Sequence, residues 1–369
     1  MTRPPAAPGA AGPGAYVLGV DSGGSGLRVA LGRVELPGPL ATTLCAEPVR
    51  TGPGGIDATH LLDQLLPAAR ELLDRASASA TDDAPTGEVA ALAVGAAGMA
   101  TLGDRLRSEL PGALTEALGV RRLALAADAV TAYAGAVGQR PGAVVAGGTG
   151  MIALGTDLME WHRADGWGHL LGDSGGGAWI GRAGLDAAMR AHDGRRGGSP
   201  ALLDRLRSVF GPAEALPGLL YPRSDRPAVL ASFAPEVAAC AGADPVAAGI
   251  LRQAAGHIAE AAAAVCPTSA GTEAEAEADE SGEVALTGGL FKMGEPLIAP
   301  LREELAQLLP GVRVTTAAGD PLTGALRIAR ALAAGDLRLP RHPTMLFVPQ
   351  EHGSAQHGGT AVRDEPRTR

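Results

Sequence analysis

The sequence predicts an α/β protein with two domains. Its 369 residues are enough for two domains with a substantial core. Short apolar runs of strand length alternate with longer stretches whose apolar residues have helical spacing. A strand–glycine turn–strand pattern occurs twice, at 16–34 and again at 143–156. This repeat suggests two similar sheets whose glycine-rich ends face a common site.

Composition and charge exclude several classes of function. No apolar run reaches the roughly 18 residues that span a bilayer, and residues 1–15 lack the pattern of a secretory signal. We therefore expect a cytoplasmic protein with no membrane partner. The net charge is −9, the one lysine is Lys292, and the arginines form no dense basic stripe, so no nucleic-acid partner is expected. Cys45, Cys240 and Cys266 form no CxxC pair and suit neither zinc nor an iron–sulfur cluster within the chain.

The first glycine turn, DSGGSG at 21–26, lies between the predicted strands 16–20 and 27–34. A dinucleotide-binding fingerprint would open into a helix, whereas a strand follows here. Backbone N–H groups at such a tip can surround phosphate oxygens, and Asp21 could hold Mg²⁺ through water. An ordinary hairpin is the alternative, although it needs neither the acid nor the second glycine.

The next segment places an acid at the end of a strand. A helix is expected at 57–76, with a kink or break at Pro67. After it, a polar linker at 77–88, a strand at 89–94 and a helix at 105–118 are expected. The strand 123–127 then ends on Asp128, and a helix follows at 129–137. Ligands bind at the carboxyl ends of strands in α/β sheets, although Asp128 could also simply cap the helix.

The second glycine turn, 147–150, connects the predicted strands 143–150 and 151–156, and it lacks the GK[ST] of a Walker loop. The stretch 166–182, GWGHLLGDSGGGAWIGR, places three glycines before a predicted helix. Free N–H groups and one acid, Asp173, beside a helix N-terminus suit a small polar ligand. A tight turn in a glycine-rich protein is the alternative.

The rest of the chain predicts further helices and strands. Residues 199–266 are expected to be mostly helical, and 268–283 to be an acidic, flexible insertion. The later elements are strands at 284–287 and 312–315 and helices at 296–309 and 320–334. In the last of these helices, Gly324 and Ala325 would permit close packing. The tails, 1–15 and 340–369, are expected to be disordered.

Together these motifs resemble the sugar kinase branch of the actin/hexokinase/heat-shock ATPase superfamily. Within it, residues 16–335 resemble the N-acetylglucosamine kinase family, also described as BadF/BadG/BcrA/BcrD ATPase-like. The most specific match is that of the 166–182 stretch to the family block GWGxxxGDEGSxxWIG. The resemblance implies two ribonuclease H-like (actin-like ATPase) domains with a nucleotide and sugar cleft between them. The implied divisions are a domain at 16–138, a domain at 139–323 containing the insertion, and a helix at 324–336 that returns to the first domain.

The resemblance also implies roles for individual residues, with ATP and Mg²⁺ as cofactors and Asp21 beside the metal. Asp128 matches the general base. The residues implied to contact the nucleotide are Asp21, Gly23, Gly24, Ser25, Gly148, Thr149, Gly150, Gly288 and Gly289. The residues implied to hold the sugar are Asp128, Gly166, Trp167, Gly168 and Asp173. His169 and Trp179 are assigned to packing around the loop.

Two departures concern the sugar site: Ser174 replaces the family's glutamate, and Gly55 stands where relatives often have an asparagine. Loss of a polar partner changes discrimination among hydroxyl patterns. The expected activity is phosphorylation of an amino sugar, with N-acetylglucosamine as the leading acceptor. The alternatives are an ATPase that activates a dehydratase and a catalytically silent hexosamine sensor. A homodimer is expected.

Overall fold

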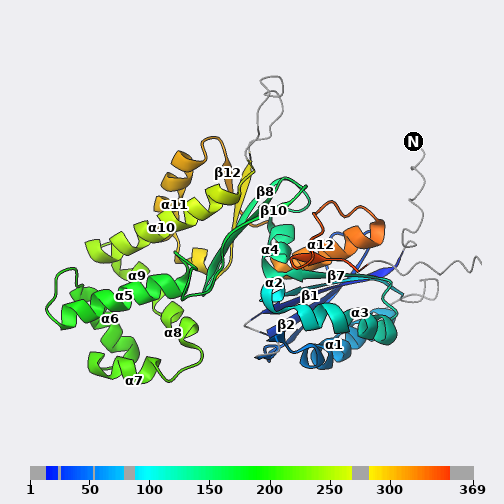
Figure 1. Ribbon diagram of the computed structural model, residues 1–369, viewed down its shortest axis with the longest axis horizontal. Helices are drawn as coiled ribbons and strands as arrows, with labels where there is room; N and C mark the ends of the chain where they lie inside the picture. The colour runs from blue at the N-terminus through cyan, green and yellow to red at the C-terminus, as the bar shows by residue number, and fades with distance from the viewer. Residues whose placement is uncertain (1–13, 24–25, 53–54, 79–87, 268–281, 350–369) are drawn as a thin grey trace, which may run out of the picture.

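The computed structural model describes residues 14–23, 26–52, 55–78, 88–267 and 282–349. The chain forms two lobes, each built on its own β-sheet (Figure 1). We call the part built on the six-stranded sheet lobe I and the part built on the five-stranded sheet lobe II. Residues 1–13 of the predicted tail 1–15, most of the linker 77–88 and residues 268–281 of the predicted insertion 268–283 lie outside the described residues. Glu283, assigned to the flexible insertion, is instead buried as the first residue of β11.

The lobe I sheet has the strand order β13-β7-β6-β1-β2-β3. β1, β2 and β3 form an antiparallel meander, β6 and β7 run parallel to β1, and β13 pairs antiparallel with β7. Its strands are β1 (Tyr16–Gly23), β2 (Gly26–Arg33), β3 (Ala41–Cys45), β6 (Val89–Ala96), β7 (Arg122–Ala127) and β13 (Leu346–Phe347). A small separate pair is formed by β4 (Thr51–Gly52) and β5 (Gly55–Ile56).

The lobe II sheet repeats this connectivity, with the order β10-β9-β8-β11-β12. β8, β9 and β10 form the meander, and β11 and β12 run parallel to β8. The strands are β8 (Gly142–Gly147), β9 (Met151–Thr156), β10 (Trp161–Asp165), β11 (Glu283–Thr287) and β12 (Arg313–Thr316). The prediction of an α/β protein with two similar sheets is confirmed. Both glycine turns connect the first two strands of their sheets.

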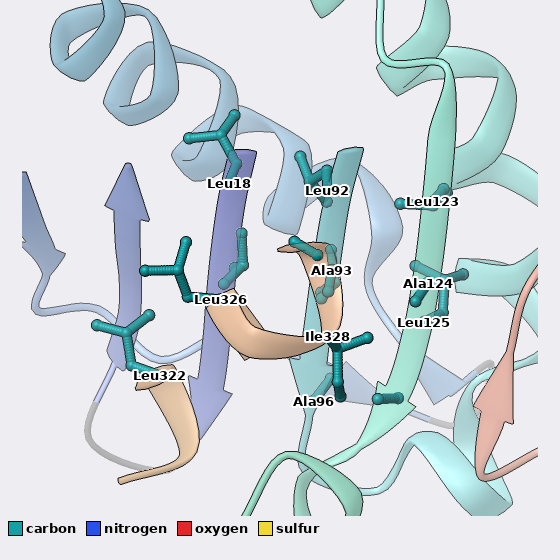
Figure 2. Close-up of a cluster of buried hydrophobic side chains, with 14 of the residues drawn as sticks. Leu18, Leu92, Ala93, Ala96, Leu123, Ala124, Leu125, Leu322, Leu326 and Ile328 are labelled. Carbon is teal, nitrogen blue, oxygen red and sulfur yellow. The ribbon is translucent and has the colours of Figure 1, made fainter. Parts of the chain in front are cut away.

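Helices cover both faces of the lobe I sheet. On one face lie α1 (Ala58–Ala78) and α3 (Asp104–Leu118), and on the other α4 (Asp128–Ala136) and α12 (Pro321–Ala334) (Figure 1). Figure 2 shows Leu322, Leu326 and Ile328 of α12 against the side chains of β1, β6 and β7. Burying such apolar side chains supplies most of the free energy that holds the lobe together.

Close packing between α12 and α4 depends on glycine. A Cβ on Gly324 would lie 1.8 Å from the Thr131 carbonyl oxygen, and one on Gly135 would lie 2.2 Å from the Asp320 carbonyl oxygen. Gly19 of β1 likewise makes room for the backbone of Leu326. The expectation that Gly324 permits close packing is therefore confirmed. The same contacts attach α12, which follows the lobe II sheet in sequence, to lobe I.

Lobe II is mainly helical outside its sheet. α5 and α10 contact each other, and α10 lies against β9 and β10 (Figure 1). The helices are α5 (Gly177–His192), α6 (Pro200–Phe210), α7 (Leu216–Leu220), α8 (Arg226–Ser232), α9 (Ala234–Cys240), α10 (Pro245–Val265) and α11 (Glu295–Leu308). The short remaining helices of the described chain are α2 (Met99–Leu102), η1 (Ala213–Ala215) and η2 (Gly289–Met293). None of the helices described is long and apolar enough to cross a membrane.

A helix break at Pro67 and disorder from residue 340 are two expectations that the structure corrects. α1 continues through Pro67 without a break, because an apolar face that includes Leu61, Leu65 and Leu72 is buried and outweighs the lost backbone hydrogen bond. The disorder expected at 340–369 does not apply to 340–349, where β13 pairs with β7 and Leu346 is fully buried. Residues 350–369 lie outside the described part. We propose that lobe I comprises residues 16–138 together with α12, which begins at Pro321 rather than at residue 324.

Candidate active site

Asp21 lies near the carboxyl end of β1, where the first glycine turn begins. Arg28 is its cross-strand partner in β2 and donates to Oδ2 of Asp21 from Nε at 3.0 Å and from Nη2 at 2.6 Å. Nη1 of Arg28 also donates to Oδ2 of Asp320 at 2.6 Å. Asp320 is the N-cap of α12 and accepts the Thr323 N–H. One arginine therefore connects the first glycine turn to the start of α12.

The first glycine turn is only partly described. Gly23 ends β1, and a Cβ at this position would meet no atom within 4 Å, so a ligand could approach the backbone closely. Gly24 and Ser25, both predicted to contact the nucleotide, lie outside the described residues.

Asp128 is the first residue of α4 and directly follows β7. It is not the N-cap: that position belongs to Ala127, and Oδ1 of Asp128 accepts the N–H of Ala129 at 2.9 Å. Asp128 is exposed to solvent, although many protein atoms lie near its carboxyl group. Burial raises the pKa of Asp128 and the charge of Asp21 adds to this rise, while the Ala129 N–H and the charge of Arg163 oppose it. The pKa of Asp128 therefore depends on charges in both lobes, that of Asp21 in lobe I and that of Arg163 in lobe II.

The second glycine turn follows β8 and is held against the start of α5. The Gly148 carbonyl accepts the Gly177 N–H at 2.9 Å, and the Thr149 carbonyl accepts the Ala178 N–H at 2.8 Å. Free N–H groups were expected at this helix start, and for these two residues that expectation is wrong, because the turn's own carbonyls use them. Gly148 and Thr149 themselves are exposed, and a Cβ on Gly148 would meet no atom within 4 Å.

Asp173 adjoins this second turn. A Cβ on Gly150 would lie 2.2 Å from Oδ2 of Asp173, so only glycine leaves room for the carboxylate there. Oδ1 of Asp173 accepts the Gly168 N–H at 3.0 Å. Burial raises the pKa of Asp173, and the nearby charge of Asp165 contributes, although the Gly168 N–H opposes the rise. A residue predicted to hold the sugar thus touches a residue predicted to hold phosphate.

The remaining predicted sugar residues form a loop between β10 and α5. Gly166 and Gly168 have φ of 75° and 85°, which glycine adopts without strain. Trp167 is 62% exposed, and the guanidinium carbon of Arg163 lies 4.3 Å from the centroid of its ring. Arg163 also donates to the carbonyls of Asp165 at 3.0 Å and of Gly166 at 2.6 Å. Arg163 therefore holds one end of this loop.

Gly288 and Gly289, predicted to accommodate adenosine, follow β11 beside the second glycine turn. Gly288 has φ of 102°, and a Cβ there would lie 2.1 Å from the Gly147 carbonyl oxygen, so glycine is required. Gly289 is exposed, with no atom within 4 Å of the place a Cβ would occupy. The structure thus brings this turn to the end of β8, next to the second glycine turn.

The two departures in the sugar site have different surroundings. Gly55 has φ of 91°, and a Cβ there would lie 2.4 Å from the Leu102 carbonyl oxygen, so the backbone leaves no room for a side chain. The N–H of Ser174 donates to Oδ2 of Asp165 at 2.9 Å.

Trp179, assigned to packing, meets His257 edge-on with ring centroids 5.2 Å apart.

Sequence reasoning did not single out Arg28, Arg163 and Asp165. The signal for Arg28 was the tight hairpin, because once the two strands pair across a short turn, Arg28 must face Asp21. No comparable signal existed for Asp165, whose role depends on the path of a loop rather than on a repeat.

Asp21 fits a magnesium ion held through one carboxylate. Arg28 occupies Oδ2, while Oδ1 accepts no hydrogen bond from the described residues. The described chain contains no group of three or more His, Cys, Asp or Glu side chains that could form an all-protein metal site. Mg²⁺ commonly binds one or two carboxylates together with water and substrate phosphates. The donor set near Asp21 suits that mode of binding.

Comparisons with known proteins agree with this fold. The chain is 28% identical over 182 residues to an N-acetylmuramic acid/N-acetylglucosamine kinase from Clostridium acetobutylicum, over 49% of this chain and 55% of the relative. The match thus spans about half the length of that curated relative. A proposed N-acetylglucosamine kinase from Chromobacterium violaceum has 31% identity and a TM-score of 0.54, with 84% of this chain and 97% of that chain covered.

A second solved structure shows the fold alone. It is a proposed N-acetylglucosamine kinase from Porphyromonas gingivalis, with 18% identity, a TM-score of 0.59, and coverage of 84% of this chain and 97% of that one. These similarities confirm the predicted pair of actin-like ATPase domains. The family model for the BadF/BadG/BcrA/BcrD ATPase family matches residues 18–327. The chain belongs to the BadF/BadG/BcrA/BcrD ATPase family.

Proposed function

We propose that this protein transfers the γ-phosphoryl group of ATP to a hydroxyl of an amino sugar, with the 6-hydroxyl of N-acetylglucosamine as the leading acceptor. The observation that carries the proposal is the position of Asp128 directly after β7, at the same edge of the lobe I sheet as Asp21 and two strands away from it. The names of the kinase from C. acetobutylicum and of the C. violaceum protein agree with an amino sugar as substrate.

In the proposed mechanism, Asp128 is the general base. Its carboxylate accepts the proton of the sugar hydroxyl as the hydroxyl oxygen forms a bond to the γ-phosphorus. The bond between that phosphorus and the bridging oxygen breaks, and ADP leaves with the electron pair. Because nearby protein atoms and the charge of Asp21 raise the pKa of Asp128, its carboxylate is a stronger base than an unperturbed aspartate.

Other residues would position the two substrates. Asp173 would accept hydrogen bonds from sugar hydroxyls, and the exposed backbone at Gly148 and Thr149 would approach phosphate oxygens. Bound beside Asp21, Mg²⁺ would neutralise charge on the phosphates. Closure of the lobes would exclude water, which competes with the sugar as a nucleophile.

Sugar-dependent ADP release tests this proposal directly. Purified protein with MgATP is offered N-acetylglucosamine, glucosamine, N-acetylmannosamine, N-acetylmuramic acid and glucose in separate reactions. We expect release above the background rate with at least one amino sugar, and a phosphorylated product of matching mass. ADP release that no sugar stimulates would refute the kinase assignment.

The variant Asp128→Asn tests the assignment of the base. We expect turnover to fall by at least a hundredfold, the scale of general base catalysis, while ATP binding remains near the wild-type level. Asp104→Asn is the matched control, because Asp104 is also the first residue of a helix in lobe I and is 96% exposed at its side chain. Equal rates for Asp128→Asn and the wild type would eliminate Asp128 as the base.

The same experiments separate the alternatives. A hexosamine sensor would bind sugar in calorimetry without releasing ADP. A dehydratase activator would carry an iron–sulfur cluster between subunits and absorb visible light, whereas a kinase would be colourless. We also propose a homodimer, which the molar mass from light scattering would test.

A further inference from the structure

Asp165 lies in the loop that carries the predicted sugar residues, and its backbone is strained. It is the last residue of β10 and has φ of 61°, in the left-handed region that residues other than glycine seldom adopt. Such a conformation persists only where surrounding contacts maintain it, and it is concentrated at binding and catalytic sites. At Asp165, the contacts of the carboxylate with the backbone of Asp173 and Ser174 maintain this conformation.

The Asp165 carboxylate closes the loop across its base. Oδ1 accepts the Asp173 N–H at 2.5 Å, and Oδ2 accepts the Ser174 N–H at 2.9 Å. These bonds join the two ends of the seven-residue segment 166–172. A Cβ on Gly172 would lie 2.3 Å from Oδ1 of Asp165, so glycine is needed for the carboxylate to reach its partners. Bonds to a charged acceptor are stronger than bonds between neutral groups.

The residue fixed by this closure is Asp173. Its own φ is 55°, and its side chain lies between the Gly168 N–H and Gly150 of the second glycine turn. The direction of the Asp173 carboxylate therefore depends on a backbone that the Asp165 carboxylate holds. Aspartate tolerates positive φ better than most residues other than glycine. The two carboxylate bonds, together with the bond from Arg163 to the Asp165 carbonyl, hold it in that conformation here.

We propose that Asp165 is a positioning residue for the acceptor site, which fixes the backbone of Asp173 and Ser174 so that the Asp173 carboxylate faces the sugar. This inference rests on the proposed function, since it assumes that Asp173 binds the acceptor. Asp165 acts through Asp173 and takes no part in the chemical step, so it should affect sugar binding more than turnover.

The informative substitution is Asp165→Gly. Glycine removes both hydrogen bonds but adopts positive φ without strain, so any loss cannot come from the backbone conformation of the new residue. We expect KM for the sugar to rise about tenfold or more, with KM for ATP within about twofold of wild type and kcat at saturating sugar changed less than KM. Asp165→Asn keeps one acceptor oxygen and tolerates positive φ, so it should recover part of the lost sugar affinity.

The matched control is Asp157→Gly, at the opposite end of the same β9–β10 hairpin. Asp157 also accepts two backbone N–H bonds with its carboxylate, from Met159 at 2.8 Å and Glu160 at 3.1 Å. It lies in the turn that joins the two strands, so its substitution should leave KM for the sugar unchanged.

Hydrogen exchange gives a readout that does not depend on activity. The Asp173 and Ser174 amides should exchange at least tenfold faster in Asp165→Gly than in the wild type, and at the wild-type rate in Asp157→Gly. Unchanged exchange and unchanged KM in Asp165→Gly would overturn the inference. A wild-type protein that no sugar stimulates would instead refute the proposed kinase activity, and the exchange rates would then show by themselves whether Asp165 orders the loop.

Discussion

At the scale of single residues, Asp128 must be charged to act as a base although its surroundings favour the neutral form. Burial and the neighbouring charge of Asp21 both raise the pKa of its carboxyl group. Arg163 opposes the shift from the other lobe. An environment that strengthens a base also makes its charged form costly, and the two consequences can be measured separately.

The first consequence is a pH-dependent rate. We expect kcat to fall as the pH decreases through the raised pKa of Asp128, at a pH above the value near 3.9 of an unperturbed aspartate. The pH–rate profile of the wild type at saturating substrates measures this. A profile flat from pH 7 down to the onset of acid unfolding would contradict a raised pKa.

The second consequence is an opposite trend in stability. Native Asp128 holds its proton more tightly than the unfolded chain does, so the contribution of Asp128 to stability falls as the pH rises through its raised pKa. Asp128→Asn carries no such charge and should be at least as stable as wild type at pH 7, with the difference vanishing at low pH. Urea unfolding at several pH values checks the sign, and an Asn variant much less stable at pH 7 would contradict it.

Among the residues of the site, sequence reasoning found those within short motifs and missed those that act across the fold. Asp21, Asp128 and Asp173 lie next to glycine turns or strand ends that the sequence displays. Arg28 acts across a strand pair, and Asp165 bonds to Asp173 across the seven-residue segment 166–172. Such contacts depend on register and on backbone strain, which periodicity does not encode.

At the scale of elements, the sequence predicted the buried strands and the edge strand β12, and it missed the edge strands β3, β10 and β13. β1, β6, β7 and β8 are apolar and were expected from that pattern. β10 has the sequence WHRAD and lies at a sheet edge. Edge strands often carry charged residues, so β10 lacks the apolar pattern by which a buried strand is predicted. The sequence did predict the start of α12 at Asp320, but not that Asp320, besides capping this helix, also pairs with Arg28 of β2.

Two variants of Asp320 separate these two roles. Asp320→Asn keeps a capping oxygen and loses the ion pair, whereas Asp320→Ala loses both. We expect the Ala variant to be less stable than the Asn variant by about 1 kcal/mol, the usual contribution of an N-cap. The free energies of unfolding in urea, measured at pH 7, give this difference. Equal stabilities would mean that the cap contributes nothing.

The ion pair itself should respond to acid. Partial burial would raise the pKa of Asp320, but hydrogen bonds from Thr323 and Arg28 together outweigh it and the pKa is lowered. A lowered pKa contributes stability above the unfolded value of about 3.9, and that contribution is lost as the pH falls through the native value. The advantage of wild type over Asp320→Asn should therefore be present at pH 7, begin to shrink at about pH 4 and disappear only below the lowered native pKa.

At the scale of the whole molecule, the chain crosses between the lobes more than once. α12 returns to lobe I after the last strand of lobe II. The segment 339–347, which follows α12, then contacts both lobes. The Pro340 carbonyl accepts the indole N–H of Trp161 on lobe II at 2.7 Å, and the Met345 carbonyl accepts the Ala127 N–H on lobe I at 2.8 Å. Ala127 immediately precedes Asp128, so the bond from its N–H to Met345 helps to fix the backbone that carries the candidate base.

Leu346 anchors that segment, and its truncation tests how much the anchor matters. The side chain is fully buried, and its backbone pairs with Ala126 of β7. Leu346→Ala should lower the free energy of unfolding by about 2–5 kcal/mol, the range for a buried leucine. The control Leu308→Ala removes the same atoms from a side chain that is 44% exposed and should cost about 0.5 kcal/mol. If the two variants lose equal stability in urea, burial of the Leu346 side chain does not anchor this segment. If Leu346→Ala is less stable and its kcat also falls at a temperature where it remains folded, the segment supports Asp128 as well as lobe I.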